Sequence, residues 1–206
     1  MGRSTFTAEL PYESGPILLS KEGPVTRDYF LKFIAANPDL RAELTAEGEM
    51  IVMAPAHSRS GNQNSQLAYQ LGRWAIENGK GQAYDSSAGF DLPDGSNRAP
   101  DASWVLNSRL EALSKEERDD FLPLCPDFVA ELRSKSDSVR FLRGKMTEYM
   151  ANGARLGWLI DPLNRTVHIY RPQKLVELLE NPLEASADPE LPGFVLDLTP
   201  IFNPEF

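Results

Sequence analysis

Two acidic residues occupy positions in this sequence where a carboxylate could bind a metal ion. Asp101 follows Pro100 at the entry to the apolar run "ASWVL", and Glu131 lies inside the run "FVAEL". Side chains alternate along a strand, so Glu131 shares a face with Val129, and a carboxylate at such a half-buried position requires a partner. If the two strands are neighbours, the two carboxylates, a backbone carbonyl and waters can form a magnesium site.

A lysine on the next predicted helix could complete this set. Lys145 falls at the rim of the apolar face of that helix, from which a long side chain can extend over the sheet edge toward the acids. A divalent cation polarises a phosphate and lowers the pKa of a water molecule, while a lysine orients that water or neutralises developing charge. Two acids and a lysine therefore indicate metal-assisted hydrolysis of a phosphodiester.

The elements that must position these residues predict a mixed sheet with helices packed against it, in the α/β or α+β class. The apolar periodicity predicts helices at residues 23–38, 58–79 and 138–156 and strands at 41–55, 82–107, 127–134 and 157–172. The runs 174–180 and 193–199 are predicted to form a last strand pair. We expect an N-terminal arm over residues 1–20 and a single domain over residues 21–206, ending in an acidic segment, 175–206.

Composition narrows the class of protein. The net charge is −9, but residues 175–206 hold seven acids and no Lys or Arg, whereas residues 131–155 hold six basic and three acidic residues. A basic segment on a nearly neutral body can bind a phosphate polymer. No serine-hydrolase, Walker, dinucleotide or zinc-type motif is present. One cysteine, no signal-peptide pattern and no run of about 18 apolar residues lead us to expect a cytoplasmic protein without a membrane span.

Several ordered motifs resemble a known family. These are "ELTAEGEMIVMAPAHS", "APDASWV", "PDFVAELRSKSDS", "KMTEYMANGARLGWLIDP" and "VHIYRP", which together span roughly residues 25–172. They are similar to the Uma-type restriction endonuclease family within the PD-(D/E)XK nuclease superfamily. The resemblance implies a restriction-endonuclease-like mixed sheet flanked by helices, DNA as substrate, Mg²⁺ or Mn²⁺ as cofactor, and a homodimer.

The resemblance also implies a role for each acidic motif residue. Asp101 matches the motif aspartate and Glu131 the motif glutamate, which together would hold the metal. The second Pro-Asp pair only opens the Glu131 strand, which makes Asp127 structural. Glu43 matches an acid of the family's "E-L-x-x-x-G" stretch and would complete the site through a water.

The basic residues depart from the superfamily pattern at one position. A lysine usually follows the motif glutamate at the second position, but here that residue is Arg133, which cannot deprotonate in a protein. Lys145 matches a lysine that this family carries on the following helix. Arg133 and Lys135 flank the predicted site and would contact phosphate, and His57 falls where the family often places a histidine.

Structural interpretations of the same residues remain open at this stage. Asp101 would then be a turn residue after Pro100, and Glu131 would form a buried ion pair with Arg133 or Arg140. At the level of function, the alternatives are a catalytically degenerate nuclease fold that serves as a binding module, and a hydrolase of small phosphoesters. A nuclease requires the carboxylates of Asp101 and Glu131 to lie within about 5–6 Å of each other, close enough to share one ion.

Overall fold

The computed structural model describes residues 17–19, 23–53 and 55–204, and its centre is a six-stranded sheet with the order β11-β10-β9-β8-β7-β4. All neighbouring strands in this sheet are antiparallel except β8 and β9. Its strands are β4 (Gly81–Asp85), β7 (Ala102–Leu106), β8 (Phe128–Leu132), β9 (Leu156–Asp161), β10 (Thr166–Tyr170) and β11 (Glu177–Glu180). The predicted mixed sheet is confirmed.

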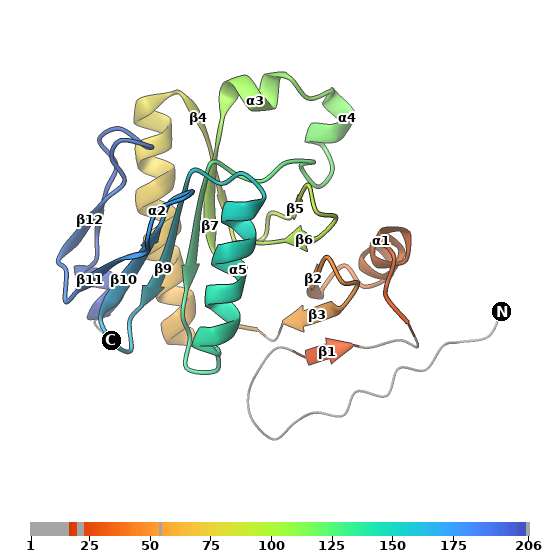
Figure 1. Ribbon diagram of the computed structural model, residues 1–206, viewed down its shortest axis with the longest axis horizontal. Helices are drawn as coiled ribbons and strands as arrows, with labels where there is room; N and C mark the ends of the chain where they lie inside the picture. Colours follow the sequence, from red (N-terminus) through yellow and green to blue (C-terminus); the bar gives the residue numbers. More distant parts are fainter. Residues whose placement is uncertain (1–16, 20–22, 54, 205–206) are drawn as a thin grey trace.

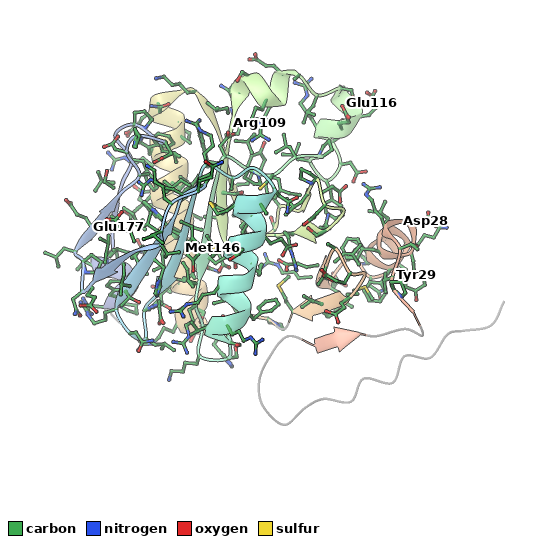
Figure 2. The ribbon with its side chains drawn as sticks, in the orientation of Figure 1. Asp28, Tyr29, Arg109, Glu116, Met146 and Glu177 are labelled. Carbon is green, nitrogen blue, oxygen red and sulfur yellow. The ribbon has the colours of Figure 1, made fainter. Side chains whose placement is uncertain are left out.

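Two long helices cover opposite faces of this sheet (Figure 1). Helix α2 (Ser58–Asn78) packs Leu67 and Leu71 against one face, in the same apolar cluster as Trp104 of β7 and Trp158 of β9. Helix α5 (Val139–Ala151) packs on the other face, and Met146 points from it toward the sheet (Figure 2). Since parallel strands cannot be joined by a tight turn, α5 also forms the crossover from β8 to β9.

A smaller sheet carries the N-terminal part of the described chain beside α5 (Figure 1). It has five strands in the order β1-β3-β2-β6-β5. They are β1 (Ile17–Leu19), β2 (Arg41–Leu44), β3 (Met50–Met53), β5 (Phe90–Asp91) and β6 (Asn97–Arg98), with α1 (Arg27–Ala36) packed against them. The predicted arm lies largely outside the described residues, but β1 falls within it and pairs with β3, so that stretch is a sheet strand.

The C-terminal segment differs from the predicted strand pair. Strand β11 pairs with β10, and β13 (Val195–Asp197) pairs with β12 (Glu184–Ser186) in a separate hairpin, so the two predicted partners do not meet. Leu196 explains this arrangement because it is fully buried in the core on the α2 face, whereas its neighbours in β13 are exposed. Helix α6 (Thr199–Phe202) follows and packs on α2.

The charged segment that connects β7 to β8, residues 107–127, contains two short helices, α3 (Asn107–Glu111) and α4 (Lys115–Arg118). A capping box at Ser114 and Glu117 starts the second of them.

In the part of the chain that the structure describes, no helix is long and apolar enough to span a membrane.

Gly81 tests the packing of β4 on β7. A β-carbon at this position would lie 2.3 Å from the backbone oxygen of Val105 and 2.5 Å from the Trp104 ring. We expect Gly81→Ala to lower the free energy of unfolding by about 1–3 kcal/mol, measured by urea denaturation. The control is Gly72→Ala, which adds a methyl group where nothing lies within 4 Å and should stabilise α2 by up to about 1 kcal/mol. Equal effects of the two changes would contradict the packing described here.

Candidate active site

The β7–β8 ladder brings the two predicted metal ligands to the same end of the sheet. Its last pair is Ala102 with Ala130, so Asp101 lies just beyond the ladder and Glu131 is the next residue along β8. The negative charge of Asp101 acts on Glu131, so the two carboxyl groups lie near each other. The Oδ2 atom of Asp101 accepts a hydrogen bond of 2.8 Å from the backbone N–H of Leu132, which fixes the aspartate at the strand end.

Glu131 lies on the α5 face of the sheet and is contacted by two residues of that helix. Lys145 Nζ is 2.8 Å from Glu131 Oε1, and the hydroxyl of Tyr149 donates a 2.9 Å hydrogen bond to the same oxygen. Both contacts use Oε1, so within the described residues Oε2 stays available to a ligand. The alternative interpretation of Glu131, an ion pair with Arg133 or Arg140, does not hold, since Glu131 pairs with Lys145 and Arg133 pairs with Asp161.

Lys145 is more deeply placed than the sequence predicted. Its side chain is 5% exposed, and its Nζ also contacts Glu43 Oε1 at 2.9 Å. The ammonium thus lies between Glu43 of β2 and Glu131 of β8, and it joins the small sheet to the large one. The predicted reach of Lys145 toward an acid agrees with its contact to Glu131, but its burial was not foreseen, because the helical pattern does not show that Glu43 of the small sheet packs against it.

Glu43 is held directly by other residues. Arg98 Nη1 donates to Glu43 Oε2 at 3.0 Å, and the backbone N–H of Ala99 donates to Oε1 at 3.1 Å. The guanidinium of Arg98 also pairs with Glu148 of α5 at 2.7 Å. Sequence reasoning missed both Arg98 and Glu148. Arg98 stands three residues before Asp101, and this nearness in the sequence was the signal that could have placed it at the site.

Burial and charge set the protonation of this network. Burial raises the pKa of Glu131 to about 7, and the negative charges of Asp101 and Glu43 act in the same direction against the opposing effect of Lys145. Burial also raises the pKa of Asp101. For Glu43, burial acts against ionisation, but Lys145 and Arg98 outweigh it and lower the pKa.

The ammonium of Lys145 stays charged at neutral pH. Burial would lower the pKa of Lys145, but Glu131 and Glu43 outweigh that effect and raise it. A lysine with a raised pKa supplies positive charge and does not accept a proton from water. Lys145 is therefore suited to neutralising charge on a phosphate.

Asn64 of α2 is a further polar residue in contact with Asp101. Its Nδ2 donates a 3.0 Å hydrogen bond to Asp101 Oδ1, while its own Oδ1 is buried and has no hydrogen-bond partner. Buried acceptors are nearly always satisfied, so this oxygen has an unfilled capacity for a ligand. Sequence reasoning missed Asn64, because one amide in the polar run "GNQNSQ" carries no distinguishing signal.

The donor set fits a hard divalent cation. In the described part of the chain, no three Asp, Glu, His or Cys side chains gather closely enough to hold a metal alone. Two carboxylates completed by waters are nevertheless the kind of set that Mg²⁺ accepts, since it is usually bound by one or two carboxylates and retains several waters in proteins. Glu43 does not join that set, because Lys145 stands between it and Glu131.

The other predicted residues lie apart from this network. Arg133 Nη1 forms a 2.8 Å ion pair with Asp161 at the end of β9. Lys135 is exposed after β8, and His57 is an exposed residue at the N-cap of α2 without a capping hydrogen bond. Asp127 has the structural role that was predicted, since its Oδ2 accepts a hydrogen bond from the backbone N–H of Leu106.

A cavity of about 480 Å³ opens next to the network. Lys145 contributes to its wall, so the cavity reaches the candidate site. The residues that matter for its chemistry are Arg98, Arg140, Phe141, Gly144, Lys145 and Glu148.

Comparison with known proteins agrees with this fold. A crystal structure described as a putative nuclease belonging to DUF820, from Anabaena variabilis ATCC 29413, superposes with a TM-score of 0.73 at 22% identity, covering 87% of this chain and 98% of that one. The similarity establishes a nuclease-type fold. The family model Uma2, described as "Putative restriction endonuclease", matches residues 27–199, and the chain belongs to this family. The resemblance seen in the motifs is thus confirmed. Comparison with curated proteins gave no match.

The pKa of Glu131 predicts how stability changes with pH. A carboxyl group whose pKa is raised on folding contributes stability at low pH that is lost as pH rises through the folded pKa, here about 7. We expect the free energy of unfolding of the wild type to fall, relative to Glu131→Gln, by about 1–3 kcal/mol between pH 5 and 8. Urea denaturation at several pH values measures this difference. The lowered pKa of Glu43 acts only at more acidic pH, and parallel profiles for the two proteins would contradict the assignment.

Proposed function

We propose that this protein is a divalent-cation-dependent nuclease that hydrolyses phosphodiester bonds in DNA. The observation that carries the proposal is the buried pair of Lys145 with Glu131, next to Asp101, which the backbone of Leu132 holds at the same end of β8. Membership of a family described as "Putative restriction endonuclease" supports DNA as the substrate.

In this proposal the two carboxylates bind Mg²⁺ or Mn²⁺. Asp101 and Glu131 would hold the ion, and Asn64 would keep Asp101 in place through its hydrogen bond to Oδ1. The cation supplies charge neutralisation on the phosphate and acidifies water. Tyr149 fixes Glu131 by its hydrogen bond to Oε1, so that Oε2 points away from the helix contacts.

The remaining polar residues position Lys145 and the substrate. Lys145, held between two glutamates, places one positive charge beside the phosphate as negative charge develops there. Glu43 orients Lys145 from the other side. Lys135 is a candidate phosphate contact, whereas Arg133 reaches a phosphate only by leaving Asp161. We assign no step to His57.

Plasmid cleavage at low salt with Mg²⁺ or Mn²⁺ tests the assignment. We expect Asp101→Asn and Glu131→Gln each to reduce the cleavage rate about 100-fold or more. The control is Glu177→Gln, a change at an exposed glutamate on the outer strand β11, far from α5 (Figure 2), which should leave the rate unchanged. Cleavage that persists in both site variants would place the active site elsewhere.

Lys145 is tested separately because its removal also affects folding. We expect Lys145→Met to reduce cleavage about 100-fold and to destabilise the fold by about 3–5 kcal/mol, since two buried glutamates lose their partner. Lys145→Arg keeps the charge and should retain more of the stability than of the activity. Circular dichroism during thermal unfolding, measured beside cleavage, separates the two effects, and a fully active Lys145→Met variant would exclude a catalytic role.

A second candidate function is a nuclease fold without activity that serves as a binding module. Arg133 favours it, because this residue replaces the usual motif lysine and is already paired with Asp161. Calorimetric titration with Mg²⁺ and Mn²⁺ separates the candidates. Binding that is lost in Asp101→Asn supports the nuclease, whereas no binding and no cleavage support the module.

A further inference from the structure

The cavity beside Lys145 is not used by the proposed metal site. Asp101 and Glu131 do not contribute to its wall, which is built from α5 and from Arg98 of β6. Its volume of about 480 Å³ lies within the range of small-molecule sites, about 300–1,000 Å³. The question is which part of a substrate this space would take.

One wall of the cavity is a single face of α5. Phe141, Gly144, Lys145 and Glu148 are spaced at i, i+3, i+4 and i+7, so their side chains line up on that face. A glycine inside a helix costs about 1 kcal/mol relative to alanine. Nothing lies within 4 Å of a β-carbon built at Gly144, so no packing contact among the described residues requires glycine there. The missing side chain at Gly144 leaves the cavity open beside Lys145.

Three side chains in the wall of the cavity have properties that suit the binding of a nucleotide. Phe141 offers a half-buried aromatic ring, on which a base can stack. Arg140 is exposed and forms no ion pair with any described residue, so its guanidinium is available to a phosphate. The charge of Glu148 is already neutralised by Arg98, which removes repulsion toward a phosphate.

Stacking on Phe141 selects the form of the strand. Inside a duplex both faces of a base are covered by its neighbours, so only a base that has left the stack can place its ring on Phe141.

We propose that the cavity is a subsite for one unpaired nucleotide of a DNA strand, adjacent to the bond that is cut. The base stacks on Phe141, and the phosphates lie toward Arg140 and Lys145. This proposal rests on the nuclease function proposed above and narrows its substrate to single strands or unpaired ends of duplexes.

Fluorescence anisotropy of the full chain with a labelled ten-nucleotide oligodeoxythymidine, in EDTA so that no strand is cut, tests the subsite. We expect the wild type to bind this strand at least about tenfold more tightly than a labelled blunt duplex of equal length. Phe141→Leu removes the stacking ring and should weaken binding about 5- to 100-fold. Gly144→Leu fills the cavity and should weaken it about as much.

Gly72→Leu is the matched control, because it adds the same side chain to an equally open glycine on α2, across the sheet from α5. It should bind as the wild type does. Thermal unfolding of each variant checks that binding is measured on folded protein. If Phe141→Leu proves unstable, Gly144→Leu still tests the subsite, because nothing lies within 4 Å of a β-carbon at Gly144.

Two results would overturn the subsite. One is equal binding by the wild type and both cavity variants, and the other is equal affinity for the strand and the duplex. Plasmid cutting by the wild type in either case would leave the nuclease function standing. Conversely, suppose that the wild type binds the strand, that both variants lose this binding, and that no form cuts DNA. That result would support the subsite and contradict hydrolysis.

Discussion

The buried ammonium of Lys145 is the constraint on which the rest of this structure depends. A charge in a protein interior is tolerated only when it is paired and hydrogen-bonded. Lys145 meets this requirement with Glu131 on one side and Glu43 on the other. These partners come from different sheets, so the position of the small sheet against α5 is tied to the electrostatics of the candidate site. Arg98 strengthens the same link by pairing Glu43 with Glu148.

This network distributes charge unevenly between two glutamates that share one lysine. Glu43 receives two cations and a backbone N–H, so it remains ionised despite its burial. Glu131 shares its surroundings with Asp101 and has a raised pKa. The more basic carboxylate is thus the one near Asp101, where a cation would gain most from it. Asn64 of α2 contacts Asp101 through its Nδ2, while its own buried oxygen has no hydrogen-bond partner among the described residues.

Much of the fold could be predicted because local patterns determine it. The helix over Ser58–Asn78, its end at Gly79 and the β8–α5–β9 unit follow from periodicity, a glycine cap and buried apolar runs. The pairing of β13 with β12 could not be predicted, because it depends on which strand covers the apolar core on the α2 face. The pairing of the Asp101 strand with the Glu131 strand agrees with what the sequence analysis required for a shared site.

The contacts of Arg98 and Asn64 show the limit of sequence reasoning at the site. Each is made to a residue of a different element, at separations of 55 residues for Arg98 with Glu43 and 37 for Asn64 with Asp101. No local pattern marks such a pair, since the partner is chosen by how the sheets pack. The burial of Lys145 was missed for the same reason.

The long separation between Glu43 and Lys145 has a consequence for the newly made chain. These residues are 102 positions apart and belong to two different sheets. During synthesis the acidic residues at positions 43, 101 and 131 emerge before the lysine that balances them. Arg98 can already pair with Glu43 at that point, but Glu131 still lacks the ammonium that it shares with Glu43 in the finished fold. A nascent fragment that ends before residue 145 therefore cannot yet link the small sheet to the large one through this lysine.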